Sequence, residues 1–291
     1  MYAACRALGL NAVRVGVLQG TRTMAQVFSS LDQVVDAARN NRMYVMLGNP
    51  DALGTPKPGK WANNLATNKA NSIAFWEPTA DRYRNETHVF YEMLNEPEEW
   101  GLWSNYTSSA GVPTALTVAL REVFDAMRSA APDTVLLAPT AANFDASGGM
   151  AQYIKAIQAW ESLGAVDWSK ACWSYHGYNS TARMQVNSKY TASPGDAVTP
   201  APDVGRAALA WMRDRYPIVC TETNWWQEAA RNVLIDVLDA HEDVEIAWSL
   251  MRHPLQSAAS SFSDELFAPG NKPLDHKVDQ LRTRGFHIPV E

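Results

Sequence analysis

The sequence predicts an α/β fold in which helices alternate with the strands of a parallel sheet. Seven strand-like segments recur about every 35–45 residues, with helix-like segments between them. These segments are apolar along most of their length, as strands covered on both faces are. No glycine-rich phosphate-binding fingerprint follows the first strand, where the sequence is VGVLQGTRT. Together these observations favour a (β/α)8 barrel of the TIM type over an open, doubly wound sheet.

Each element is predicted from its local pattern. A short amphipathic helix opens the chain and ends at Gly9, a β-branched strand follows at 10–18, and apolar residues at helical spacing predict a helix at 23–42. Pro113 is expected in the first turn of its helix, and Gly164 is expected to end another. The remaining predictions are strands at 43–49, 88–96, 134–140, 171–178, 217–223 and 244–251, and helices near 67–84, 113–130, 150–163, 203–215, 227–241 and 275–284.

Seven strands are one fewer than a closed (β/α)8 barrel contains. Two alternatives stay open: the segment FHIPV at 286–290 covers the gap, or the barrel is incomplete. An uncovered edge predicts a homodimer that buries it. No linker, repeat or change of composition divides the chain, so we expect a single domain over residues 1–291.

The composition excludes several classes of protein. Lys and Arg number 25 against 31 Asp and Glu, a net charge of −6, which argues against a nucleic-acid partner. No apolar run approaches the ~20 residues that cross a bilayer. The three cysteines form neither a disulfide framework nor a metal-binding spacing, so we expect buried thiols at Cys172 and Cys220 and neither metal nor cofactor. The first residues lack a signal-peptide pattern, which indicates a trimmed mature protein or a gene that begins here.

Polar side chains are found at the ends of five predicted strands. In barrels of this type the chemistry lies at the carboxyl ends of the strands. A buried carboxylate without a partner is costly, so two glutamates that each follow an apolar run need a partner or a function. The candidate residues are Arg14, Asn95, Glu96, His176, Tyr178, Glu222 and Trp248.

Two carboxyl groups on different strands suit glycoside hydrolysis. One group protonates the leaving oxygen and the other attacks the anomeric carbon, and their different surroundings separate the two pKa values. We expect Arg14 to keep the attacking carboxylate ionised. Each residue also has a structural interpretation: Glu96 as a helix cap, Glu222 as an ion-pair partner of Arg14, and His176 as a core histidine.

Five segments resemble glycoside hydrolase family five and its clan of retaining barrel enzymes. YEMLNEP at 91–97 resembles the acid/base strand, and PIVCTETNWW at 217–226 resembles the nucleophile strand. IAWSLMR at 246–252 resembles the last strand with its substrate-stacking Trp. GLNAVRVGV at 9–17 resembles the family's second strand, and SYHGY at 174–178 resembles its His-x-Tyr strand.

The resemblance implies a role for each matched residue. It implies that Glu96 is the acid/base and Glu222 the nucleophile, supported by Arg14, Asn95, His176, Tyr178 and Trp248. It further implies retaining cleavage of β-linked glucans, mannans or related glycans by a secreted enzyme that needs no metal. The match begins after the family's first strand, which has no counterpart here.

One strand departs from the family pattern. The family's third strand ends in Asp-x-His, but here the matching stretch is LGNP, with Gly48 and Pro50 in those places. Asn49 is a partial substitute. The departure affects the substrate contacts expected at this strand end.

The tryptophans fit a sugar-binding cleft, because an indole ring packs against the C–H face of a sugar ring. We expect Trp160 and Trp211 to lie in the core instead, since both are on predicted helices. The candidates for the cleft are Trp61, Trp100, Trp103, Trp225, Trp226 and Trp248.

Two functions from other classes stay open. A non-catalytic, degenerate carbohydrate-binding barrel is suggested by the absent first strand and the lost Asp-x-His pattern. An unrelated metal-dependent barrel enzyme would need a cluster of ligands at the strand ends, where His176 is the single histidine.

Overall fold

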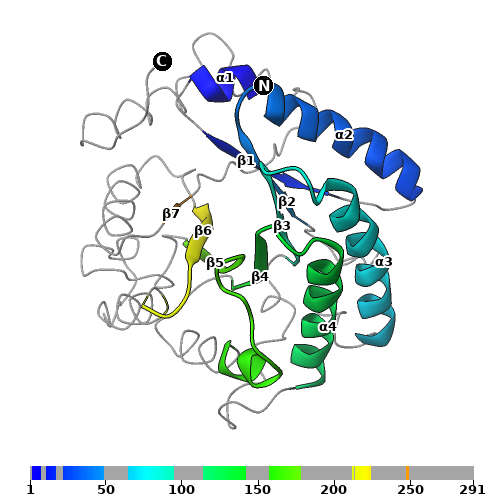
Figure 1. Ribbon diagram of the computed structural model, residues 1–291, viewed down its shortest axis with the longest axis vertical. Coiled ribbons are helices and arrows are strands. Elements are labelled where there is room, and N and C mark those ends of the chain that lie inside the picture. The colour runs from blue at the N-terminus through cyan, green and yellow to red at the C-terminus, as the bar shows by residue number, and fades with distance from the viewer. Residues whose placement is uncertain are drawn as a thin grey trace, which may run out of the picture.

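The computed structural model describes residues 2–7, 11–17, 22–48, 65–94, 114–141, 157–177, 212, 214–223 and 247–248. Within them, seven parallel strands form one sheet in which each strand pairs with the next along the chain (Figure 1). The predicted parallel α/β fold is therefore confirmed. The strands are β1 (Ala12–Gly16), β2 (Tyr44–Gly48), β3 (Val89–Glu92), β4 (Leu136–Ala141), β5 (Ala171–Gly177), β6 (Ile218–Thr223) and β7 (Ala247–Trp248).

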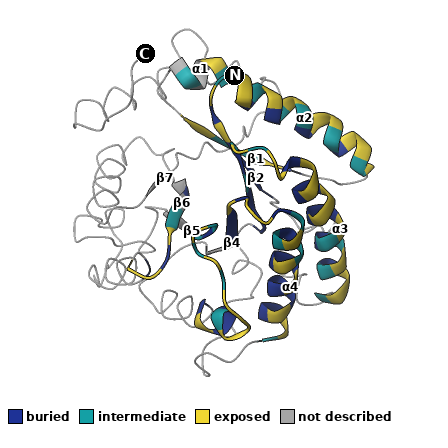
Figure 2. Cartoon of the chain, viewed as in Figure 1, coloured by how far each residue is buried: buried dark blue, intermediate teal, exposed yellow. Residues whose placement is uncertain are grey.

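Helices cover the outer face of the first strands (Figure 1). The labelled helices are α1 (Tyr2–Ala7), α2 (Met24–Asn40), α3 (Leu65–Tyr83) and α4 (Ala115–Ala130). The buried residues of α2, α3 and α4 face the sheet, and the exposed residues of these helices face outward (Figure 2). No helix among the residues that the structure describes is long and apolar enough to span a membrane.

Local signals account for the helix ends. Thr23 caps α2 through a capping box with Gln26, in which each side chain bonds the other residue's backbone N–H. Thr114 caps α4 by accepting a hydrogen bond from the backbone N–H of Thr117. Helix α4 therefore begins after Thr114, and the prediction of Pro113 inside its first turn is wrong. Gly164 follows the helix at 157–162 with φ 147°, a value that favours glycine, as predicted.

The core lies between the sheet and the helices. Trp76 of α3 packs edge to face on Tyr91 of β3, with ring centroids 5.7 Å apart. Trp160 packs in the same way on Trp173 of β5, at 5.8 Å. All four side chains are fully buried, which confirms the prediction that Trp160 belongs to the core. Trp211 lies outside the described residues.

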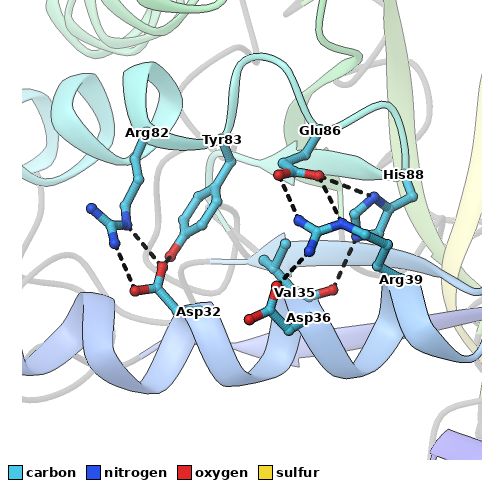
Figure 3. Close-up of polar contacts among 8 residues, drawn as sticks. All are labelled: Asp32, Val35, Asp36, Arg39, Arg82, Tyr83, Glu86 and His88. Atoms are coloured by element: carbon cyan, nitrogen blue, oxygen red, sulfur yellow. Dashed lines mark hydrogen bonds and ion pairs between the residues drawn. The ribbon is translucent and has the colours of Figure 1, made fainter.

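A polar network joins α2 to α3 and to the start of β3 (Figure 3). Arg82 donates Nε–H to Asp32 Oδ1 at 2.8 Å and Nη2–H to Oδ2 at 2.6 Å. Tyr83 donates its hydroxyl to the same Oδ1 at 2.8 Å. Further along α2, Arg39 bridges Asp36 and Glu86, with N–O distances of 2.5 Å to each. The network fixes how α2 lies against α3.

Two strands differ from prediction. The strand expected at 88–96 ends at Glu92, so Asn95 and Glu96 follow the strand rather than end it. Just beyond the strand end, the indole of Trp76 donates to the carbonyl of Met93 at 3.0 Å. The last strand is described only at 247–248, within the predicted 244–251. The predicted helices at 227–241 and 275–284, and the segment 286–290, lie outside the described residues.

Candidate functional site

Three of the predicted site residues lie on neighbouring strands near their carboxyl ends. In the pairing of β5 with β6, His176 is opposite Glu222 after a register shift at Tyr175. In the pairing of β6 with β7, Cys220 is opposite Trp248. The backbone thus brings His176, Glu222 and Trp248 to one edge of the sheet. Their side chains are outside what the structure describes.

The other predicted site residues, apart from Arg14, lie wholly outside the described residues. They follow the carboxyl ends of strands in the sequence, or come in the segments that lead away from them. They are Asn49, Trp61, Asn95, Glu96, Trp100, Trp103, Tyr178, Trp225 and Trp226.

Arg14 is described, and its partner is Glu92. Arg14 donates Nε–H and Nη2–H to the same oxygen, Oε2 of Glu92, at 2.7 and 2.5 Å. The Glu92 side chain is completely buried, whereas 22% of the Arg14 side chain is exposed. The two residues are separated by strand β2, so this ion pair reaches across a whole strand.

Alternation along the strands places this ion pair on the inner face of the sheet. Tyr91 donates its hydroxyl to the carbonyl of Ala80 in α3, so Tyr91 points outward to the helices. Successive side chains of a strand point to opposite faces, so Glu92 points inward. In the register, Glu92 is beside Gly48 on β2 and Leu137 on β4.

Gly48 makes room for the carboxylate. A Cβ atom at Gly48 would lie 2.8 Å from Glu92 Oε2, closer than any ordinary contact. The residue therefore has to be glycine while Glu92 keeps this position. Gly48 thus leaves the space beside β2 to a carboxylate from β3.

Cys172 faces the same interior. It pairs with Leu137 across β4 and β5, and Leu137 pairs with Glu92. Burial, and secondarily the charge of Glu92, raise the pKa of the Cys172 thiol to about 12. The thiol is therefore neutral at physiological pH. The residue as a whole is half-buried, so the prediction of a fully buried Cys172 is wrong.

The segment that leads from β3 to Glu96 is anchored from outside. Met93 and Leu94 are almost fully buried, and the carbonyl of Met93 accepts the hydrogen bond from Trp76. The backbone N–H of Met93 donates to the carbonyl of Leu137 at 3.4 Å. Two neighbouring elements thus hold the chain three residues before Glu96.

Sequence reasoning missed Glu92. The signal was present in YEMLNEP, where a second carboxylate precedes Glu96 by four residues within an apolar run. The strand register shows what the pattern alone did not: Glu92 faces the same side as Arg14, two strands away. Among the described residues, no group of three or more His, Cys, Asp or Glu side chains is arranged to hold a metal ion.

Comparison with known proteins gives one family match. The model of the family described as Cellulase (glycosyl hydrolase family 5) matches residues 1–253. Endoglucanase Z of Dickeya dadantii (strain 3937) is 28% identical over 113 residues. This match covers 38% of the chain and 21% of that protein, so the chain matches only about a fifth of its curated relative.

Solved structures share the fold at low sequence identity. An endo-beta-1,4-glucanase from Xanthomonas axonopodis pv. citri superimposes with a TM-score of 0.66 at 14% identity, covering 96% of this chain and 89% of that one. Cel5A of Thermotoga maritima, solved with mannotriose, gives 0.64 at 16% identity, covering 95% and 88%. The catalytic domain of Thermobifida fusca endoglucanase Cel5A, solved with cellotetraose, gives 0.60 at 16%, covering 96% and 84%. The fold is therefore of the (β/α)8-barrel type.

Proposed function

The chain belongs to glycosyl hydrolase family 5, and from that membership we propose that it is a secreted, retaining, endo-acting β-glycanase. Its substrate is a β-1,4-glucan or a mannan, and residues 1–291 form a single catalytic domain. The family match over residues 1–253 is the observation that supports this proposal most directly. The named relatives support the substrate class, since they include endoglucanases and a protein solved with mannotriose.

Catalysis takes place in two steps. In the first, Glu222 attacks the anomeric carbon and Glu96 gives its proton to the leaving glycosidic oxygen, which forms a covalent glycosyl-enzyme. In the second, Glu96 takes a proton from water, and the water oxygen displaces Glu222 from the anomeric carbon. The two displacements restore the original configuration. They require carboxyl groups about 5–5.5 Å apart.

The remaining site residues bind the sugar or prepare these groups. Arg14 favours the ionised form of the nucleophile, and Tyr178 orients it by donating a hydrogen bond. Asn95 and Asn49 bind sugar hydroxyls, and His176 lies beside the nucleophile strand in the register. Indole rings provide the stacking surface for successive sugars. They are those of Trp100, Trp103, Trp225, Trp226 and Trp248.

The test is turnover of soluble β-glucan, mannan and xylan by wild type and by Glu222→Ala. We expect wild type to release reducing ends from glucan or mannan, with the β-anomer as first product in proton NMR. Glu222→Ala is expected to fold but to be inactive. Glu122→Ala, which removes an exposed carboxylate on α4, is the matched control and keeps full activity. An α-anomeric first product contradicts the retaining mechanism.

A non-catalytic carbohydrate-binding barrel is the second candidate. The observation that favours it is Gly48, where the family pattern has a substrate-contacting Asp and this chain has the buried carboxylate of Glu92 instead. It predicts that both wild type and Glu222→Ala bind cello- or manno-oligosaccharides in calorimetry and that neither turns them over.

A further inference from the structure

We propose that Glu92 is a positioning residue for the reaction: it holds the guanidinium of Arg14 in one orientation inside the barrel, where Arg14 serves the reacting carboxylates. The inference rests on the proposed function. Glu92 has no contact with substrate in the proposed mechanism, so it acts through Arg14.

The geometry of the ion pair fixes Arg14. Because Nε and Nη2 both donate to one oxygen, that edge of the guanidinium is committed to Glu92. A guanidinium has five N–H donors in a rigid plane, so fixing one edge fixes the direction of the Nη1 donors as well. Arg14 is also the partly exposed member of the pair, with 22% of its side chain exposed, so its charged group is accessible from outside the core.

Stability alone is a weak reason for such a pair. Desolvation of two buried charges offsets much of their attraction, and apolar residues of similar volume often stabilise a core as well or better. The neighbours of Glu92 on the inner face include Leu137 and Met46 of the adjacent strands, which are apolar. A charge pair at this place is better explained by a need for the guanidinium.

The surrounding residues are adapted to this pair. Gly48 lacks the side chain that would displace Oε2 of Glu92. The chain from Glu92 to Glu96 is short and is anchored at Met93 by Trp76. A single segment therefore holds both the acid/base and the residue that orients Arg14.

The test compares the pH dependence of kcat/KM in wild type and Glu92→Gln, after both have been normalised to folded protein. Among the side chains that the structure describes on these strands, Arg14 from β1 and the neutral Cys172 from β5 face Glu92. His176 and Glu222 are further titratable residues of β5 and β6, and their side chains lie outside what the structure describes. Removing the carboxylate takes away one negative charge and keeps the positive charge of Arg14, which favours the ionised forms of Glu96 and Glu222. Both limbs of the profile should move to lower pH by about one unit. A full charge about 10 Å away shifts a pKa by about this much when the effective dielectric constant is about 20.

We also expect kcat of Glu92→Gln to fall about tenfold to a hundredfold with little change in KM, because misplacing a reacting group has effects of this size. Glu92→Asp keeps the charge and should restore the wild-type limbs. Asp32→Asn is the matched control. It removes a carboxylate bound by Nε and Nη2 of Arg82 on the outer helices, and should leave kcat, KM and both limbs unchanged.

Gly48→Ala keeps the test decisive if Glu92→Gln does not fold. The added Cβ displaces the Glu92 carboxylate while every charge is kept, so kcat should fall without a shift of the limbs. Wild-type kcat and pH limbs in all folded variants of Glu92 and Gly48 would overturn the inference. Absence of turnover by wild type on every substrate is a different outcome: it refutes the proposed function, and the positioning role with it.

Discussion

Two arginine–carboxylate pairs in this chain use the same donors in different surroundings. Arg14 on the inner face and Arg82 on the helix layer each donate Nε–H and Nη2–H to a carboxylate. Glu92 is completely buried, whereas Asp32 and Arg82 are 37% and 43% exposed. Arg82 donates to both carboxylate oxygens of Asp32, whereas Arg14 donates both N–H groups to one oxygen of Glu92. Hydrogen-bond geometry therefore does not indicate which pair contributes more to the free energy of unfolding, whereas burial does.

The two pairs also differ in their neighbours. Asp32 accepts a further hydrogen bond from Tyr83, and the bonds from Arg82 and Tyr83 lower the pKa of Asp32 (Figure 3). Water supplies alternative partners at this surface. At the inner face, Gly48 and Leu137 flank Glu92 in the register, so the buried carboxylate lies beside apolar residues of both neighbouring strands.

The largest expected effect comes from separating the inner pair. Glu92→Leu should lower the free energy of unfolding by about 3–5 kcal/mol, because it leaves Arg14 without its buried partner. The measurement is urea denaturation followed by Trp fluorescence. The double variant Arg14→Met with Glu92→Leu should recover most of the loss. A loss below about 1 kcal/mol for Glu92→Leu, the level of a surface pair, would contradict the expected difference in stability between the two pairs.

A smaller loss of stability is expected where helix α3 is bonded to the chain that follows strand β3. Trp76→Phe keeps a buried aromatic ring but leaves the carbonyl of Met93 without its donor, at a cost of about 1–3 kcal/mol. Since this carbonyl lies three residues before Glu96, kcat should fall as well. Phe75→Leu, a neighbouring buried position on α3, is the control: it should change stability and leave kcat per folded molecule unaltered. Equal kcat in the two variants contradicts the anchoring role.

The outer pair should contribute about 1 kcal/mol or less. Asp32→Asn is expected to lower Tm slightly at pH 7, and the difference from wild type should shrink in high salt. The pKa of folded Asp32 lies below its ordinary 3.8. Its contribution is thus fully present above pH 3.8 and is lost as the pH falls further. Tm values of both proteins at pH 7 and pH 3 test this, and a difference that grows at pH 3 would be the wrong sign.

The smallest expected effect is at Cys172. With its pKa raised to about 12, almost no thiolate is present at pH 8, and the thiol is inside the sheet. Iodoacetamide at pH 8 should leave the native Cys172 peptide unmodified in mass spectrometry, while urea-unfolded protein is alkylated. Rapid alkylation of the native protein would show that the inner face is open to reagents.

Patterns that depend on neighbours in the sequence predicted this fold well. Runs of apolar residues identified all seven strands, and β1 and β6 lie within a few residues of their predicted limits. Helix α2 begins one residue inside its prediction because Thr23 forms a capping box. The strand predicted at 88–96 ends at Glu92, and the bond from Trp76 to Met93 just beyond that end is a tertiary contact that the local pattern does not contain.

The candidate site was harder to predict because it depends on contacts between strands. Alternation within YEMLNEP does not reveal that Glu92 faces Arg14, since the two residues are 78 positions apart. Nor does LGNP reveal why Gly48 is there, because the atom it makes room for belongs to another strand. Such facts follow from register, which single-strand patterns do not contain.

The order of the strands has a consequence for how the protein is made. Every described strand pairs with the one that follows it in the chain, from β1 to β7. No pairing in this series has to wait for a distant segment, so loop closure is short at each step and the sheet is able to grow in the order of synthesis. Arg14 emerges from the ribosome before Glu92. Their ion pair is therefore possible only after β3 has followed β1 and β2, and it ties the first strand to the third.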